Sequence, residues 1–211
     1  EYFKDKGYLN TTVVISQNID PISLSGVILD IQINKGEKVK INSITFNGLN
    51  QFSEKKLKRK LKETKEKKFF RIFKTSKFLD KAFKTDLQQI INLYNEKGFR
   101  DAQIVLENID EISSNLIDIN ITIEEGIKYH FRNIDWLGNT KYSSEYLDLL
   151  LGIKSGDVYD EKMMNERLQM SMSGTDITSL YMDDGYLFFN IDPIETLVEG
   201  DSIDYEIRIY E

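Results

Sequence analysis

The sequence repeats itself at an offset of 90 residues, and this repeat constrains the fold more than any other feature. Residues 36–61 match residues 126–151 at positions that include Gly36 with Gly126, Ile44 with Ile134, Phe46 with Trp136, Gly48 with Gly138, Ser53 with Ser143, Leu57 with Leu147, and Leu61 with Leu151. The register then slips by three residues, so the later matches are Tyr94 with Tyr181, Gly98 with Gly185, and Phe99 with Tyr186. A third copy of that last signature, Phe3, Gly7 and Tyr8, opens the chain. Similarity at a fixed period predicts a tandem array of small modules rather than one enzyme built around one pocket.

Alternating apolar residues predict strands with one buried and one solvated face. Isoleucine occupies every second position from Ile117 to Ile123, and similar alternation occurs in residues 27–33 and 203–209. A partner strand is expected upstream of each, at residues 8–16, 99–107 and 186–191, which would make three hairpins. Opening strands are expected at residues 38–47 and 128–137. A sheet with one wet face predicts that the helices lie on the other face alone.

Two helices are expected between the opening strand and the hairpin of each complete module. The first begins near Ser53 or Ser143, whose hydroxyls suit a helix N-terminus. The second carries apolar residues at three- and four-residue spacing and ends near Gly98 or Gly185. In the later module Gly174 interrupts this helix, which predicts a kink or a close backbone contact. The predicted fold class is therefore α+β, with strand-helix-helix-strand-strand modules.

These motifs resemble the polypeptide-transport-associated (POTRA) repeat. The resemblance rests on Ile-x-Phe/Trp-x-Gly after the first strand, Tyr-x-x-x-Gly-Phe/Tyr at the end of the second helix, and a Glu-Gly joint at Glu125 and Gly126. It is strongest with BamA-like outer-membrane assembly factors of the Bacteroidetes type. The resemblance implies three parts: the end of one repeat at 1–36, a complete repeat at 37–126 with an insertion, and a complete repeat at 127–211.

The resemblance implies a non-enzymatic role in the periplasm, as part of an outer-membrane protein. Such an arm would receive unfolded outer-membrane proteins and dock accessory subunits. An exposed strand edge offers unpaired backbone groups to an extended client, so binding by β-augmentation would need little sequence specificity. The candidate edges are Thr12, Val13, Val14 and Ile15; Gln103, Ile104 and Val105; and Leu187, Phe188 and Phe189. The alternatives are a POTRA arm of another transporter, of the two-partner secretion or translocation type, and an envelope or division scaffold.

The charge distribution is strongly uneven along the chain. Residues 53–84 hold 14 basic and 4 acidic residues, whereas residues 127–211 hold 7 basic and 17 acidic residues. The pattern is consistent either with solvated helix faces or with an anionic partner for the basic part. A basic and aromatic stretch between the helices is a second candidate surface, for a protein partner or membrane lipid: Lys67, Lys68, Phe69, Phe70, Arg71, Phe73, Lys74, Lys77 and Phe78. The alternative is that its aromatic rings complete the core. Nucleic acid is not expected as a partner, since no Gly-x-x-Gly clamp occurs.

The sequence offers no constellation for catalysis. The single histidine, His130, falls in an expected strand, and the chain has no cysteine. The acidic residues near Asp157 and Asp183 do not have the spacing of a calcium loop. There is also no phosphate-binding loop, dinucleotide glycine pattern or nucleophile elbow. The expectation is therefore no enzymatic activity, no catalytic residue, no cofactor and no metal.

Overall fold

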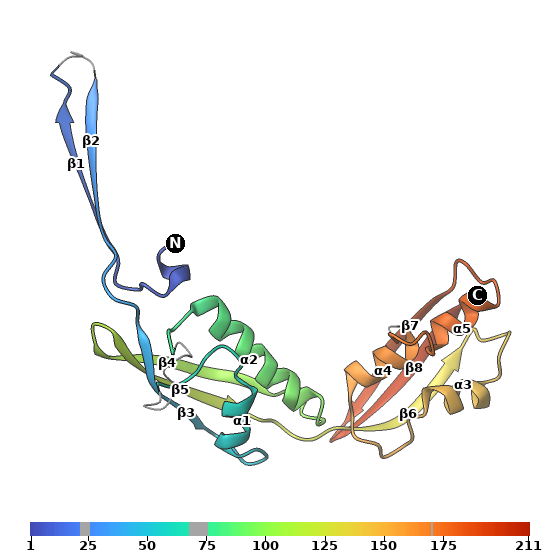
Figure 1. Cartoon of the computed structure of the whole chain (residues 1–211). Coiled ribbons are helices and arrows are strands. Elements are labelled where there is room, and N and C mark those ends of the chain that lie inside the picture. Colours follow the sequence, from blue (N-terminus) through green and yellow to red (C-terminus); the bar gives the residue numbers. More distant parts are fainter. Residues whose placement is uncertain (22–25, 68–75, 170) are drawn as a thin grey trace. The chain divides into compact units, whose positions relative to one another are not determined.

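A computed structural model of the chain describes residues 1–21, 26–67, 76–169 and 171–211. The chain divides into two compact units (Figure 1). The first unit comprises residues 1–90 and 104–123, and the second comprises residues 91–103 and 124–211. Residues 91–103 therefore belong with the second unit, a grouping that the spacing of the sequence motifs does not reveal.

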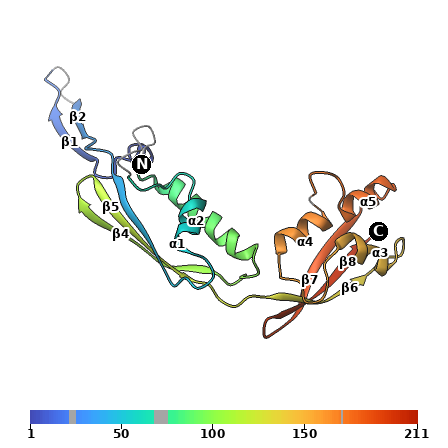
Figure 2. The ribbon, with the colours of Figure 1, turned by 60° about the horizontal axis from the view of Figure 1, so that its bottom comes forward.

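The first unit contains most of a three-stranded sheet with two helices on one face, and only the ends of these elements at residues 91–95, 103 and 124 are grouped with the second unit. The strands are β3 (Lys40–Asn47), β4 (Gln103–Ser113) and β5 (Leu116–Glu124), in the order β3-β5-β4, and β3 runs parallel to β5. Helices α1 (Glu54–Lys60) and α2 (Asp80–Asn95) lie on the same side of this sheet (Figure 2). The predicted module order and the single helical layer are confirmed.

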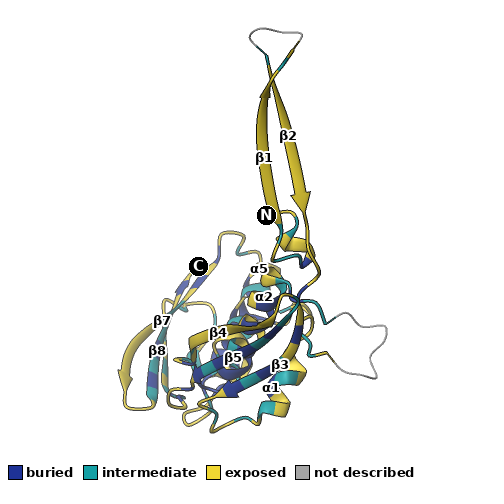
Figure 3. Ribbon diagram, turned by 90° about the vertical axis from the view of Figure 1, so that its left-hand side faces the viewer, coloured by how far each residue is buried: buried dark blue, intermediate teal, exposed yellow. Residues whose placement is uncertain are grey.

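The same unit begins with a short 3-10 helix, η1 (Lys4–Lys6), and an antiparallel hairpin of β1 (Thr12–Ile19) and β2 (Val27–Asn34). Every residue of both strands is exposed, as the yellow colour along them shows in Figure 3. Gly7 follows η1 at φ 89°, close to the values of Gly98 (90°) and Gly185 (91°) at the ends of the later helices. The opening segment therefore has the local geometry of the later helix-to-hairpin connections.

The second unit repeats the architecture with one change. Its sheet has the order β6-β8-β7, built from β6 (His130–Leu137), β7 (Asn190–Glu199) and β8 (Ser202–Tyr210). The first helix is α3 (Ser144–Leu151), but the expected single second helix is two helices, α4 (Glu161–Leu168) and α5 (Ile177–Asp183). Gly174 adopts φ 66° in a turn between them, and Asp176 caps α5 through the Ser179 amide. The predicted kink is thus a complete break in the helix, and the alternative of a close backbone contact is wrong, because a Cβ at Gly174 would meet nothing within 4 Å among the described residues.

Each unit buries its own apolar residues. In β5 the alternating residues Ile117, Ile119, Ile121 and Ile123 are at most 2% exposed. The core cluster of the second unit is drawn from residues 129–209 and includes the matching positions of β8. Tyr94 and Tyr181 are fully buried beside their helix ends, as predicted. Their hydroxyls donate to Glu125 (2.7 Å) and Glu211 (3.0 Å), and these equivalent tyrosine-carboxylate pairs explain why a glutamate stands at that position.

Gly48 and Gly138 are required by the way the first strand of each sheet ends. Their φ values are 79° and 89°, in the left-handed region. A Cβ atom at Gly48 would lie 2.2 Å from the carbonyl oxygen of Ile123, and one at Gly138 would lie 2.2 Å from that of Ile209. A side chain is therefore excluded both by the backbone conformation and by the close approach of the central strand. Ser53 and Ser143 cap the helices that follow, as predicted.

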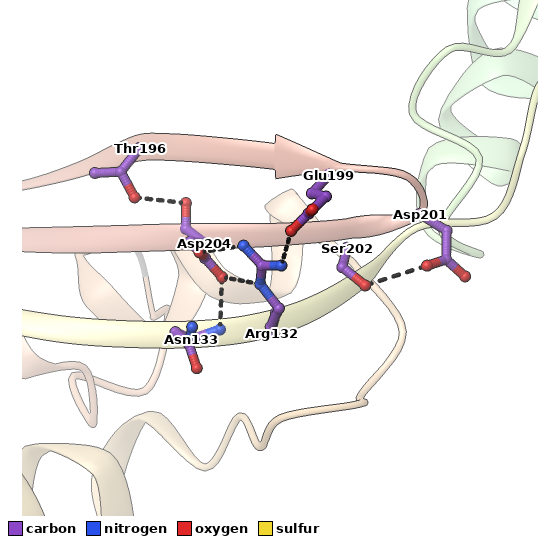
Figure 4. Close-up of polar contacts among 7 residues, drawn as sticks. All are labelled: Arg132, Asn133, Thr196, Glu199, Asp201, Ser202 and Asp204. Atoms are coloured by element: carbon purple, nitrogen blue, oxygen red, sulfur yellow. Dashed lines mark hydrogen bonds and ion pairs between the residues drawn. The ribbon is translucent and has the colours of Figure 1, made fainter.

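A carboxylate on the central strand supports an irregularity in the first strand of each sheet. The register shifts between Ile41 and Ser43 in β3 and between Phe131 and Ile134 in β6. In the second unit Asp204 accepts the Asn133 amide (3.1 Å) and receives two hydrogen bonds from Arg132, at 2.8 and 2.7 Å (Figure 4). The Arg132 bonds hold the pKa of Asp204 below its usual value.

The first unit uses the equivalent arrangement with neutral partners. Asp118 accepts from the side chains of Asn42 (2.9 Å) and Ser43 (2.5 Å). These bonds, the Ser43 bond first, likewise lower the pKa of Asp118. A carboxylate that satisfies the donors of the irregular strand is therefore a shared structural device of the two units.

Candidate docking surfaces

Each sheet has two outer strands, and the chain itself covers one of them. In the first unit the Ile41 amide donates to Ser76 O (2.9 Å), and the Phe78 amide donates to Val39 O (2.8 Å). In the second unit the Phe131 amide donates to Asp157 O (2.9 Å), and the Tyr159 amide donates to Tyr129 O (2.9 Å). The segments that follow the first helices thus occupy the outer sides of β3 and β6 near their starts. Less of each edge is left there for another chain.

The opposite outer strand of the first unit, β4, has β5 as its neighbour in the described sheet. It is 11 residues long and contains no proline. Its exposed apolar side chains include Val105 and Leu106, at 50% and 57% exposure. The predicted edge residues Gln103, Ile104 and Val105 lie in β4, an outer strand of the described sheet, and their role in binding stays a prediction.

The corresponding edge of the second unit, β7, is less suited to pairing. Pro193 lies within the strand and has no amide hydrogen to offer, and the register shifts between Glu195 and Leu197. Prolines and bulges are devices that protect edge strands from further pairing. The two units therefore differ in how open this edge is.

The prediction that residues 187–189 form an edge strand is wrong. Leu187, Phe188 and Phe189 precede β7, which starts at Asn190. Phe189 is buried and stacks on Tyr181 with ring centroids 4.1 Å apart, whereas Phe188 is 96% exposed. Because Phe189 packs against the helix end, the chain makes a turn here before the strand can begin.

The remaining predicted edge residues, Thr12, Val13, Val14 and Ile15, lie in β1, and their role in binding stays a prediction. The β1–β2 hairpin places apolar pairs on one face, including Val13 with Ile33 and Ile15 with Ile31. These residues are 51–63% exposed, whereas the matching residues of β5 are buried. The hairpin thus presents to solvent the face that the complete modules bury.

The predicted basic and aromatic surface is only partly visible. Lys68, Phe69, Phe70, Arg71, Phe73 and Lys74 lie outside the described residues. Lys67 is exposed, and Lys77 is half-buried where it pairs with Lys40 at the edge of β3. Phe78 is 3% exposed and packs against Phe83 with ring centroids 5.5 Å apart, so its assignment to a contact surface is wrong. It completes the core, as the alternative interpretation held.

Grooves between the first strand and the first helix of each unit were not predicted. In the first unit the groove has a volume of about 620 Å³, and its lining contains two carboxylates, Glu54 and Glu66, and four cations: Lys55, Lys58, Arg59 and Lys65. In the second unit a groove of about 540 Å³ lies at the same place and is lined by three carboxylates, those of Asp135, Glu145 and Asp148, and by two cations, Arg132 and Lys154. The uneven distribution of charge along the sequence could have indicated these grooves. Only the fold shows that the charge of the lining residues reverses sign between equivalent grooves.

The described residues contain no cluster of three or more side chains suited to holding a metal ion. Within the same part of the chain, no helix combines the length and the apolar character required to cross a bilayer.

Comparison with protein families shows a match to the POTRA model, described as a surface antigen variable number repeat, at residues 39–126 and 129–211. Among curated proteins, a putative outer membrane protein assembly factor of Treponema pallidum is 24% identical over 190 residues, which cover 88% of this chain and 21% of that protein. The outer membrane protein assembly factor BamA of Neisseria meningitidis is 24% identical over 213 aligned residues, covering 99% of this chain and 26% of that protein. The chain thus spans about a quarter or less of these relatives.

Solved structures show the same fold. The POTRA3-5 fragment of BamA from Haemophilus influenzae matches with a TM-score of 0.53 at 15% identity, covering 100% of this chain and 76% of that one. BamA from Haemophilus ducreyi lacking POTRA domains 1-3 also matches with a TM-score of 0.53, at 17% identity, covering 82% of this chain and 29% of that one.

Proposed function

Because the chain belongs to the POTRA family, we propose that it is part of the periplasmic arm of an outer-membrane protein assembly factor. In this role it receives unfolded outer-membrane proteins and docks accessory subunits, without catalysing a reaction. The names of the related proteins from Treponema and Neisseria support the assembly role. The open strand edges support the mode of client binding.

The observation that carries client binding is the edge of β4. An outer strand presents alternate N–H and C=O groups along its free side, and an extended client can pair with them whatever its side chains. The exposed Val105 and Leu106 add apolar contact for the alternating residues of such a client. The outer edge of β3 is less available, because the chain pairs with its first residues, and β7 is interrupted by Pro193.

The expected affinity is low. Four backbone hydrogen bonds, at a net ~0.5–1.5 kcal/mol each, give about 2–6 kcal/mol. This range corresponds to dissociation constants of about 0.04 mM or weaker. Weak binding that does not depend on sequence suits a protein that passes clients on.

Chemical-shift mapping with a peptide from a strand of an unfolded outer-membrane protein tests this proposal. The amides of β4 are expected to shift on titration, while those of the central strand β8 in the other unit stay unchanged. The matched control is the same peptide with every second backbone amide N-methylated, which removes the hydrogen bonds and keeps the side chains. Equal binding of both peptides, or no shifts along β4, would reject β-augmentation.

We also propose that residues 1–36 are the final part of a further POTRA repeat. The support is the hairpin with one apolar face, together with Gly7 in the conformation of Gly98 and Gly185. In the complete modules the same face is covered by the unit's own helices. The hairpin should therefore become protected from hydrogen exchange in a longer chain that supplies such helices. Unchanged exchange in that longer chain would reject this assignment.

A further inference from the structure

Helix α1 and the turn after it form a surface dominated by cations. In addition to the groove-lining cations, this surface includes three exposed lysines, Lys56, Lys60 and Lys62. The turn is held rigidly, because the buried carboxylate of Asp86 accepts from the amides of residues 62–64 at 2.7–3.0 Å. The positive charges are therefore presented from a fixed backbone rather than from a loose tail.

The fold does not need this charge. At the offset of 90 residues, Lys55 corresponds to Glu145 and Lys58 to Asp148, and α3 contains no basic residue. Both helices nevertheless bury the same two leucine positions and carry the same serine cap. Because an acidic and apolar helix serves equally well in the second unit, the basic side chains of α1 are not explained by folding.

The groove already holds two carboxylates of its own, those of Glu54 and Glu66. Glu66 Oε1 accepts from the Ile44 backbone amide (3.0 Å) and from Lys58 Nζ (2.8 Å). Lys58 also pairs with Glu54, and although burial opposes the change, these two partners raise the pKa of Lys58. The exposed Lys55 and Arg59 border the same groove. Glu66 thus shows that this groove can bind a carboxylate between a backbone amide of β3 and a lysine side chain.

We propose that the α1–β3 groove of the first unit binds an acidic, extended segment of a partner protein, whose carboxylates contact Lys55 and Arg59. The inference specifies the docking part of the proposed function and rests on it. A protein segment fits better than a membrane surface, because cations line a groove of about 620 Å³ rather than only a convex face. Charged groups along such a groove raise the association rate and favour partners of opposite charge.

The test measures binding of a fluorescein-labelled peptide of alternating glutamate and serine by fluorescence anisotropy. The wild-type chain is expected to bind it, with affinity falling as salt is added, and to ignore the same peptide with glutamine in place of glutamate. The variant Lys55→Glu with Arg59→Glu should weaken binding at least about tenfold, equivalent to about 1.4 kcal/mol. The matched control is Lys97→Glu with Lys128→Glu, two exposed lysines that change the net charge equally.

Equal weakening by both double variants would mean that net charge alone attracts the peptide, and would overturn the proposal. Absence of wild-type binding would also overturn it. If vesicles with anionic phospholipid bind through Lys55 and Arg59 while the peptide does not, the partner is a membrane surface and the proposal is wrong. Circular dichroism checks that the variants fold. Titration with the outer-membrane strand peptide distinguishes failure of this inference from failure of the proposed function. If that peptide binds at β4 and the acidic peptide does not bind, only the inference about the groove is refuted.

Discussion

Replacing Gly138 by alanine should destabilise the second unit far more than replacing Gly156. Both glycines have nearly the same backbone conformation, with φ 89° and 88°. The new Cβ at position 138 would lie 2.2 Å from Ile209 O, whereas at position 156 it would meet nothing within 4 Å among the described residues. The pair of variants therefore separates the cost of the left-handed conformation from the cost of the close approach.

The conformational cost alone is about 1–2 kcal/mol, which is the whole effect expected for Gly156→Ala. At Gly138 the contact falls more than 1 Å short of an ordinary van der Waals distance of about 3.4 Å. Relieving it requires the turn after β6 to move away from β8, or bond angles to distort at a cost of about 4 kcal/mol for 15°. We expect a total loss of about 3–5 kcal/mol for Gly138→Ala.

Urea denaturation followed by tryptophan fluorescence measures this difference. Trp136 is the single tryptophan and lies in β6, so its emission reports unfolding of the second unit. Equal slopes of free energy against urea for the two variants would show that both unfold from comparable states. A loss for Gly138→Ala no larger than that for Gly156→Ala would refute the close-approach argument.

Three further predictions concern stability. Asp204→Asn should lower the free energy of unfolding at pH 7 and make that free energy less dependent on pH in acid. The reason is that the pKa of Asp204 is lower in the folded protein than its unfolded value of about 3.9. The ionised carboxylate therefore stabilises the fold above this value, and the stabilisation is lost as the pH falls below about 3.9. Trp136 fluorescence in urea at pH 7 and pH 3 measures this, and parallel pH profiles for the variant and wild type would count against it. Ile31→Ser should cost less than about 0.5 kcal/mol, since Ile31 is 54% exposed, whereas Ile121→Ser at the matching, fully buried position should cost about 4 kcal/mol. Thermal unfolding followed by circular dichroism compares the two, and similar melting temperatures would contradict the distinction. Phe78→Ala should cost about 3–5 kcal/mol in the first unit, because its ring is buried against Phe83. A variant as stable as the wild type in the same assay would contradict the burial of Phe78 in the core.

Local patterns in the sequence predicted the elements that depend on local physics. Alternating isoleucines gave β5 its buried face, and Ser53 and Ser143 capped the helices where expected. The start of β7 was misplaced because Phe188 and Phe189 have the composition of a strand. Burial of Phe189 against Tyr181, a contact between elements, decides that residues 187–189 turn instead. For the break between α4 and α5 the sequence likewise predicts only a kink or a close backbone contact at Gly174.

The candidate surfaces divide in the same way. The position of residues 103–105 in an outer strand could be predicted, because the family resemblance implies that the second strand of each module lies at the sheet edge. The burial of Phe78 could not be distinguished from exposure, since an aromatic residue beside lysines suits either a core or a surface. The reversal of charge between the two grooves also escaped prediction, because the lining residues come from a strand and a helix that the sequence does not place side by side.

By itself the sequence determined the repeat, the order of strands and helices and the glycine positions, because periodicity, capping and left-handed turns are properties of short segments. Only the tertiary structure decided which edges remain open, which aromatic rings are buried and which charges share a groove. Those outcomes depend on contacts between residues far apart in the chain. Gly138 depends on both kinds of interaction. Its position in a turn follows from the local sequence, but the carbonyl oxygen that excludes a side chain there belongs to Ile209, 71 residues further along the chain.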